Sequence, residues 1–308
     1  MPSPQADQFA ALLETARARF TNPSLDLATV RDIAEGMHVA ASEPEGVTYV
    51  EVDAGGVPAI WCIPDGADEH RVLLHSHLGG SVVASMYSDR KTAGHIAKAA
   101  GMRALVLDFR RAPEHKYPAQ IDDVEKAYRW LLSEGHRPGN IASIGHSIGG
   151  YLAIALAIRL RDAGESLPGA VLAISPWCDP SLSNPTVDSN AENDKLLARP
   201  LLEFFRESWL GGTGISADDP RVNLNNADLS NLPPTSVYYG TFELLAGEAV
   251  DFVELAAKQG VDVEGHAVEA GQHSFILAAG RVPEVDEAIQ EMGAWLRGKL
   301  GAAAPASS

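Results

Sequence analysis

Short apolar runs alternate with amphipathic helical stretches over most of this chain, and the alternation limits the folds that the sequence can adopt. Helical periodicity separates most of the runs after residue 70. Apolar strands joined by crossover helices form parallel sheets that are covered on both faces. We therefore predict an α/β fold with a mostly parallel central sheet and helices on both faces. The predicted strands of this part are Val72–Leu74, Ala104–Phe109, Ile141–Ile144, Ala170–Ile174, Ser236–Tyr239 and Val263–Val268.

Two regions outside the alternation indicate further organisation. The first 40 residues show two apolar helical faces with a break at Asn22-Pro23, and two strands, Val47–Val52 and Val57–Ile63, follow as a hairpin. The second region is polar and loop-rich, with one helix near Pro200–Leu210. We predict that both regions form a helical cap over the site. The predicted division is an N-terminal cap segment (1–44), the first part of the core (45–182), a cap insertion (183–226), the second part of the core (227–301) and a flexible tail (302–308).

The stretch Gly145-His146-Ser147-Ile148-Gly149 follows a predicted strand directly and leads into the helical stretch YLAIALAIRL. In this context G-x-S-x-G predicts a nucleophilic serine on a sharp turn. The residues two before and two after the serine approach each other and must be small, while the helix N-terminus directs free N–H groups at a reacting carbonyl. The alternative is a glycine-rich turn without chemistry. Neither phosphate-binding pattern, G-x-G-x-x-G or G-x-x-x-x-G-K-[ST], matches GHSIGG, so we predict Ser147 as a nucleophile.

A carboxylate and a histidine follow the last two predicted strands. Glu243 is the first carboxylate after the strand that ends near residue 239, and His273 stands on a glycine-led loop after the final strand. In serine hydrolases with such a turn the chain order is serine, acid, histidine. We predict that His273 takes the hydroxyl proton and that Glu243 orients the imidazole. Glu248 and Asp251 are alternatives for the acid, and His266 is the alternative for the base.

A second glycine-containing loop follows the predicted strand Val72–Leu74, with the sequence His75-Ser76-His77-Leu78-Gly79-Gly80-Ser81. Esterases place oxyanion donors at this point of the chain. Glycine lets main-chain N–H groups approach a ligand closely. We therefore predict an oxyanion hole made by the N–H groups of Gly79, Gly80 and Ile148, with a plain glycine turn as the alternative.

The stretch Asp108–Ala119, DFRRAPEHKYPA, is similar to the D-Y-R-x-A-P-E-H-x-[FY]-P-A signature of the hormone-sensitive-lipase-like esterases, a family of α/β-hydrolases. The resemblance spans roughly residues 72–275. It implies the α/β-hydrolase fold with a helical cap and hydrolysis of carboxylic esters by an acyl-enzyme route, without a metal or cofactor. The matching positions are His77 at the start of HGGG, Ser147 in G-D-S-A-G-G, Ser175–Asp179 in S-P-x-x-D, Glu243 as the acid and His273 in G-x-H-x-F.

Several positions depart from the family pattern near the expected reaction centre. Leu78 and Ile148 stand where the family usually has Gly and Ala, His146 replaces the usual Asp, and Ser81 replaces an aromatic residue. These changes predict a reshaped pocket, so cyclic esters (lactones) are an alternative to open-chain esters. The predicted pocket residues are His77, Leu78, Ser81, His146 and Trp177.

Charge and composition bear on partners and location. The formal net charge of −17 disfavours nucleic acid as a partner, because an acidic surface repels phosphates. No stretch approaches the roughly 18 apolar residues of a membrane span, and the N-terminus has no signal-peptide pattern. With only two cysteines, we expect buried thiols and a cytoplasmic protein. A late edge strand makes a homodimer reasonable, and the expected partner is a small ester or lactone.

Three other functions compete with ester hydrolysis. His75-Ser76-His77 is an H-x-H pair of the kind found in metallohydrolases, but Gly79 and Gly80 occupy the positions where H-x-H-x-D-H needs Asp and His. Zinc needs three or four ligands, which the sequence does not supply. A ligand receptor on the same fold could lack part of the triad, whereas all three members are present. An amidase or thioesterase would use the same triad.

Overall fold

The computed structural model describes residues 2–302 and contains an eight-stranded sheet in the order β1-β2-β4-β3-β5-β6-β7-β8. Strand β2 pairs antiparallel with β1 and β4, while the strands from β4 through β3 to β8 run parallel. The predicted α/β fold with a mostly parallel sheet is confirmed. The strands are β1 (Val47–Asp53), β2 (Pro58–Pro64), β3 (Asp68–Ser76), β4 (Met102–Leu107), β5 (Ile141–His146), β6 (Ala170–Ile174), β7 (Thr235–Gly240) and β8 (Val263–Val268).

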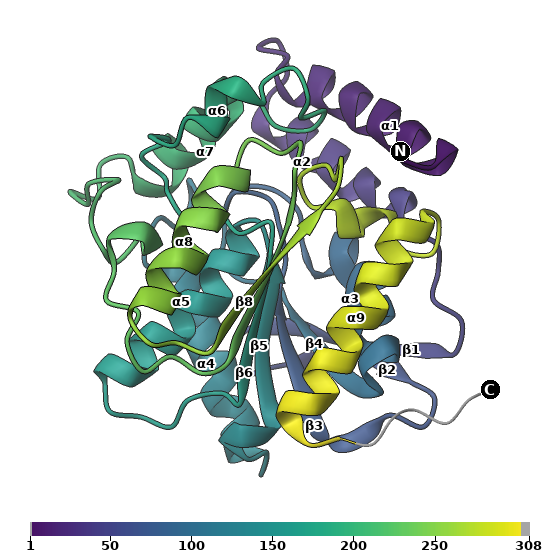
Figure 1. Ribbon diagram of the computed structural model, residues 1–308, viewed down its shortest axis with the longest axis vertical. Helices are drawn as coiled ribbons and strands as arrows, with labels where there is room; N and C mark the ends of the chain where they lie inside the picture. Colours follow the sequence, from purple (N-terminus) through teal and green to yellow (C-terminus); the bar gives the residue numbers. More distant parts are fainter. Residues whose placement is uncertain (1, 303–308) are drawn as a thin grey trace.

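Helices cover both faces and one end of this sheet (Figure 1). α3 and α9 pack together on one face, while α4, α5 and α8 lie on the other. α1, α2, α6 and α7 gather at the end of the sheet drawn at the top of Figure 1. The α-helices are α1 (Pro4–Phe20), α2 (Leu27–Glu35), α3 (Met86–Ala100), α4 (Ala119–Ser133), α5 (Ile148–Asp162), α6 (Thr186–Ser189), α7 (Arg199–Leu210), α8 (Ala246–Lys258) and α9 (Pro283–Leu300). Short 3₁₀ helices are η1 (Gly36–Ala40), η2 (Pro138–Asn140), η3 (Leu224–Asn226) and η4 (Phe275–Ala278).

The regions outside the alternation contain the elements that lie over the end of the sheet. Residues 1–44 hold α1, α2 and η1, and residues 183–226 hold α6, α7 and η3. Of the predicted tail, residues 303–308 lie outside the described part of the chain. None of the helices within residues 2–302 combines the length and the apolar character needed to cross a membrane.

Burial of the central strands explains why they appear as apolar runs in the sequence. Every residue of β5 and β6 is buried, since helices cover both faces there. β3 differs from its predicted range because it starts at Asp68, where charged and partly exposed residues precede the apolar run. Its pairing with β4 shifts register between Asp68 and Val72, so the apolar pattern marks only the second half of the strand.

Candidate active site

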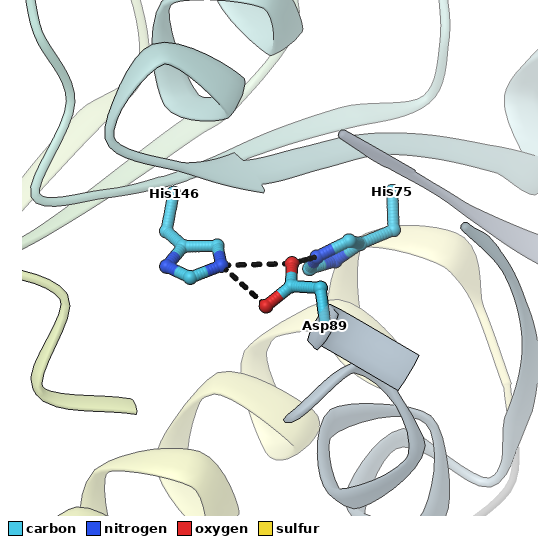
Figure 2. A group of neighbouring side chains, drawn as sticks. All are labelled: His75, Asp89 and His146. Atoms are coloured by element: carbon cyan, nitrogen blue, oxygen red, sulfur yellow. Dashed lines mark hydrogen bonds and ion pairs between the residues drawn. The ribbon is translucent and has the colours of Figure 1, made fainter. Parts of the chain in front are cut away.

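The turn between β5 and α5 holds Ser147 in a main-chain conformation that few residues adopt. Its φ is 57° and its ψ is −126°; such strain costs about 1–3 kcal/mol and persists only where the surroundings enforce it. Gly145 and Gly149 meet across the turn, and a Cβ atom on Gly149 would overlap a main-chain oxygen at the end of β3. Both positions therefore require glycine. The side chain of His146, the residue before the serine, bonds to Asp89 (Figure 2).

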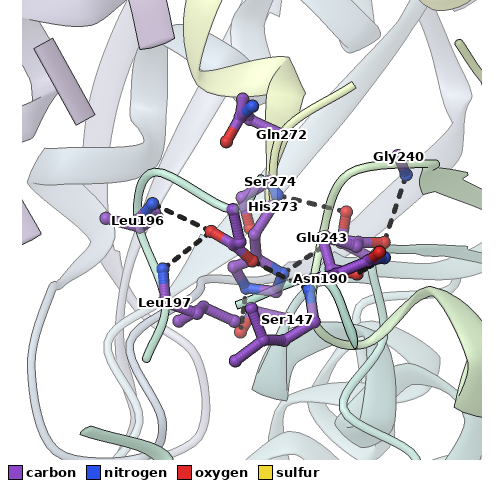
Figure 3. Close-up of polar contacts among 12 residues, drawn as sticks. Ser147, Asn190, Leu196, Leu197, Gly240, Glu243, Gln272, His273 and Ser274 are labelled. Carbon is purple, nitrogen blue, oxygen red and sulfur yellow. Dashed lines mark hydrogen bonds and ion pairs between the residues drawn. The ribbon is translucent and has the colours of Figure 1, made fainter. Parts of the chain in front are cut away.

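Three side chains form a continuous chain of hydrogen bonds at this end of the sheet. His273 Nε2 lies 2.9 Å from Ser147 Oγ, and His273 Nδ1 lies 2.9 Å from Glu243 Oε2. They come from the turn after β5, the loop after β7 and the loop after β8 (Figure 3). Ser147 keeps 8% of its surface exposed, while Glu243 and His273 are fully buried. This arrangement lets the imidazole accept the hydroxyl proton while the carboxylate holds the ring.

The alternative acids and the alternative base have other partners. Glu248 Oε1 accepts a main-chain N–H from the loop after β6 at 2.6 Å. Asp251 accepts an amide N–H from the 183–226 region at 2.7 Å. His266 lies within β8, where its ring stacks on Tyr238 at 4.4 Å. The structure therefore brings Glu243 and His273 to the serine and leaves the other three elsewhere.

The electrostatics of Glu243 favour a positive charge on its histidine partner. The pKa of Glu243 is raised above its ordinary value because burial penalises the carboxylate, and the hydrogen bond with His273 opposes this rise. The N–H of Gly240 stabilises the other carboxylate oxygen at 3.1 Å. A buried carboxylate is most stable beside an opposite charge. Glu243 is therefore placed to stabilise a protonated imidazole on its hydrogen-bond partner.

The glycine loop after β3 presents main-chain donors beside this group. Gly79 and Gly80 have φ values of 110° and 59°, and a Cβ atom at either position would overlap its neighbours, the ring of Phe205 in the case of Gly80. Within residues 2–302, the N–H groups of Gly79, Gly80 and Ile148 donate to no main-chain acceptor. Ile148 is the first residue of α5, where helix N–H groups lack internal partners. The three donors are thus free for a ligand.

Comparison with known proteins identifies the family. A family model described as the alpha/beta hydrolase fold matches residues 73–277. The chain belongs to the α/β-hydrolase family. An acetyl-hydrolase of Streptomyces hygroscopicus is 34% identical to this hydrolase over 253 residues, which cover 81% of this chain and 83% of that protein. The putative acetyl-hydrolase LipR of Mycobacterium tuberculosis is 30% identical over 94% of this chain and 93% of its own length.

Solved structures place the hydrolase more narrowly. An esterase from the bacterial hormone-sensitive lipase family superposes with a TM-score of 0.92 at 34% identity, covering 98% of this chain and 100% of that one. The resemblance found in the motifs is therefore confirmed. This α/β-hydrolase is a hormone-sensitive-lipase-like enzyme, and it is a serine hydrolase.

The cavity of the hydrolase beside Ser147 and His273 is small and apolar, at about 40 Å³. A water molecule needs about 10–15 Å³ on this scale, so the cavity holds a group the size of about three waters. Three of the side chains that line it come from the N-terminal region: Phe20, Ala34 and Met37. The opposite wall comes from the 183–226 region: Leu196, Leu197, Leu201 and Phe205. The walls of the cavity therefore include segments that lie far from the triad in sequence.

Of the predicted pocket residues, Leu78 lines this cavity and the other four do not. His77 stacks on Phe109 at 4.0 Å, and burial lowers the pKa of His77 to about 4. Trp177 lies against another tryptophan, in α7, with ring centroids 6.0 Å apart. Ser81 is fully buried, and His146 faces Asp89. The motifs predict that these residues lie near the serine, but they do not predict in which direction the side chains point.

The segment 190–197 ties the cavity wall to the loops that carry Glu243 and His273 (Figure 3). Asn190 Nδ2 donates to the main-chain oxygen of Glu243 at 2.9 Å. Asp194 Oδ2 accepts the N–H of the residue after Glu243, also at 2.9 Å. Gln272, the neighbour of His273, accepts a main-chain N–H of the segment at 2.6 Å. In the sequence this segment is part of a polar, loop-rich region, and no local motif indicates these contacts.

Asp194 links this segment to the cavity itself. Its Oδ1 accepts the N–H groups of Leu196 and Leu197, each at 2.8 Å, and both leucines line the cavity. The carboxyl is fully buried, which raises the pKa of Asp194. Arg17 of α1 donates to its main-chain oxygen at 2.7 Å. One short segment thus connects the N-terminal helix, the cavity wall and the acid loop.

Replacing Phe205 by alanine is expected to widen the cavity and to shift acyl preference toward longer chains. An added methylene in an apolar pocket is worth about 1–3 kcal/mol, so the ratio of kcat/KM for p-nitrophenyl hexanoate over butanoate should rise about 10-fold. Phe204→Ala is a matched control, because Phe204 is 43% exposed and lies outside the cavity lining. An equal change in the two variants would contradict Phe205 as a wall of the acyl site.

Proposed function

We propose that this hydrolase cleaves small carboxylic esters through an acyl-enzyme formed on Ser147. The observation that carries the proposal is the chain of two 2.9 Å contacts from Ser147 through His273 to Glu243, next to a small apolar cavity. No metal or cofactor has a part in the proposed steps, because the three side chains supply nucleophile, base and orienting acid.

The proposed reaction has two half-reactions. Ser147 Oγ attacks the ester carbonyl while its proton passes to His273 Nε2, and the resulting oxyanion accepts the N–H groups of Gly79, Gly80 and Ile148. Collapse breaks the bond to the leaving alkoxide, which departs as the alcohol with the proton from His273. A water then gives its proton to the same imidazole and attacks the acyl carbon. The acid leaves, and Ser147 recovers its proton.

The size of the cavity supports a short acyl group. A site with room for about three waters fits an acetyl or propanoyl group in the unoccupied enzyme. The names of three similar proteins agree with this size: one is an acetyl-hydrolase, one is a putative acetyl-hydrolase, and a protein of Pseudomonas putida that is 29% identical over 70% of this chain is an ethyl acetate hydrolase. We infer that acetate esters are the preferred class.

The arrangement around the site extends the proposal. The segments 1–44 and 183–226 would act as a cap, because both supply walls of the cavity.

β8 stands at one edge of the sheet, and we propose a homodimer through this edge. Cys62 and Cys178 are free and buried, which is consistent with a reducing compartment such as the cytoplasm.

A panel of substrates tests the proposed function. We expect kcat/KM to fall in the order p-nitrophenyl acetate, butanoate, octanoate, and to be lower for the p-nitroanilide of acetic acid. A five-membered lactone in the same panel decides between open-chain and cyclic esters. Faster hydrolysis of the lactone than of every aryl ester would replace the acetate proposal by the lactone alternative, and preference for the anilide would indicate an amidase.

A further inference from the structure

A second group of titratable side chains lies behind the nucleophile, outside the cavity. Asp89 of α3 sits between His75 near the end of β3 and His146 at the end of β5 (Figure 2). His75 Nε2 is 2.5 Å from Asp89 Oδ2, and His146 Nε2 is 2.8 Å from both carboxylate oxygens. None of the three has exposed surface. The proposed reaction uses none of them.

The surroundings determine where the protons of this group lie. An ionised Asp89 can only accept hydrogen bonds, so the facing Nε2 atoms carry the protons. Among the described residues, Nδ1 of His75 and Nδ1 of His146 are buried without a hydrogen-bond partner. Protonating either atom would create a buried cation with an unpaired donor, which is costly. The unpaired Nδ1 atom therefore favours a neutral ring on His146 beside the ionised carboxyl of Asp89.

The pKa shifts of His146 and Asp89 agree with a neutral ring on His146 and an ionised carboxyl on Asp89. Burial lowers the pKa of His146, and the attraction of Asp89 only partly opposes this effect. Burial of Asp89 would raise the pKa of its carboxyl, but its hydrogen bonds with the two imidazoles, and their attraction for it whenever they are protonated, outweigh burial and lower that pKa below its ordinary range, so the carboxyl is ionised.

A metal centre fits the same three residues less well. Within residues 2–302 they are the one group whose potential ligand atoms lie close enough, within 4.8 Å of one another. Structural zinc takes four ligands, and a ligating histidine normally donates its other ring N–H to a further partner. Neither Nδ1 has such a partner, and separations of 2.5 and 2.8 Å are those of hydrogen bonds.

The position of His146 connects the group to the nucleophile. The main-chain N–H of Ser147 donates to the main-chain oxygen of Ile174 on β6 at 2.9 Å. The main-chain oxygen of Ser147 accepts the N–H of Trp177 at 3.1 Å. These bonds hold the strained residue from one side. The bond from His146 to Asp89 holds the end of β5 to α3, so the turn is fixed from a second direction.

The charge of His146 also matters for the reacting histidine. His146 lies near enough to His273 for a positive charge on one to disfavour a positive charge on the other. A neutral His146 therefore leaves His273 free to accept the proton of Ser147. Burial and the lack of a partner for Nδ1 favour the neutral form of His146, although the hydrogen bond from Nε2 to Asp89 opposes this effect.

We propose that Asp89 and His146 are positioning residues for Ser147: their bond fixes the end of β5, and with it the direction of the serine hydroxyl. This inference rests on the proposed function, since it concerns the same nucleophile. It gives a role in catalysis to two residues that do not touch the substrate.

His146→Leu and His146→Gln test the proposal as a pair. Leucine has a similar size but cannot donate to Asp89, whereas the glutamine amide can donate and stays neutral. We expect kcat for p-nitrophenyl acetate to fall about 10- to 100-fold in the leucine variant, with KM changed less than about 3-fold, because a lost buried hydrogen bond misplaces the nucleophile. The glutamine variant should keep kcat within about 5-fold of wild type.

An exchange variant, Asp89→His with His146→Asp, provides an independent test. It keeps one carboxylate and two imidazoles, so its kcat should exceed that of either single replacement by about 10-fold. Titration of reactive Ser147 with diethyl p-nitrophenyl phosphate normalises every rate to active enzyme. Asp123→Asn is the control, since Asp123 is a buried carboxylate on α4 that binds Arg110, and neither residue lines the cavity. This variant should lower Tm without changing kcat.

Two results would overturn the proposal. One is equal kcat in the leucine and glutamine variants with a loss only of Tm, which would make the group a stability element. The other is an exchange variant no faster than the single replacements, which decides the question even if the leucine variant does not fold. Wild-type enzyme that neither hydrolyses esters nor takes the phosphate label would instead contradict the proposed function.

Discussion

Ser147→Ala is expected to lower ester hydrolysis by a factor on the order of 10⁶ while the protein stays folded. The variant removes the atom that would form the proposed acyl-enzyme, and with it the 2.9 Å hydrogen bond between Ser147 Oγ and His273 Nε2. The oxyanion donors and the cavity remain, so a small residual rate above that in water should persist. Steady-state hydrolysis of p-nitrophenyl acetate and labelling by an organophosphate are the measurements.

Ser143→Ala is the control for this prediction. Ser143 lies on the same strand, β5, and is buried, but its hydroxyl has no partner among the described residues. We expect its replacement to leave kcat/KM within about 2-fold, as for a change without a lost contact. Retention of more than about a hundredth of wild-type activity by Ser147→Ala would mean that another group forms the covalent bond.

Gly149→Ala is expected to destabilise the protein by about 3 kcal/mol or more and to abolish activity. In an ordinary helix this substitution stabilises by about 1 kcal/mol. Here the added Cβ atom would overlap the main-chain oxygen of Ser76, at the end of β3. That oxygen belongs to a paired strand and cannot retreat without moving the sheet. Thermal unfolding followed by circular dichroism, together with the esterase assay, measures both effects.

Gly298→Ala offers a matched comparison in α9. A Cβ atom at Gly298 meets nothing within 4 Å, so only the helical propensity changes. We expect its Tm to be unchanged or slightly higher, the opposite sign from Gly149→Ala. Similar Tm values for the two variants would show that the close approach of the turn to β3 is not a constraint on position 149.

Much of the fold could be predicted because buried parallel strands are apolar along their whole length. β6, which is buried along its whole length, has the bounds expected from the sequence, Ala170–Ile174. The edge strand β8 also has its expected bounds, Val263–Val268, although it is only partly buried and contains polar residues. α3 is harder to recognise, since it buries polar residues such as Asp89 and Thr92 together with small apolar ones and shows no clean apolar face. The burial of Asp89 in this helix is explained by its hydrogen bonds with the histidines of β3 and β5, which the sequence of the helix does not reveal.

The reacting side chains could be predicted better than the pocket. Ser147, Glu243 and His273 each stand in a short motif at the end of a strand, and parallel strands bring such ends together. The cavity walls come from α1, α2, η1 and the 183–226 region, whose packing no local motif records. His146 shows the same limit, because its neighbour in sequence is the serine while its partner in space is Asp89.

The contacts of segment 190–197 have a consequence for engineering. Variants selected for a larger acyl group will tend to change Leu196 or Leu197, and these residues share Asp194 with the loop that carries Glu243. Replacing segment 190–197 with that of a related esterase would therefore change the position of the Glu243 loop as well as the acyl selectivity. Broader scope and fast turnover are coupled traits in this enzyme, and libraries that randomise the loop should be screened for both at once.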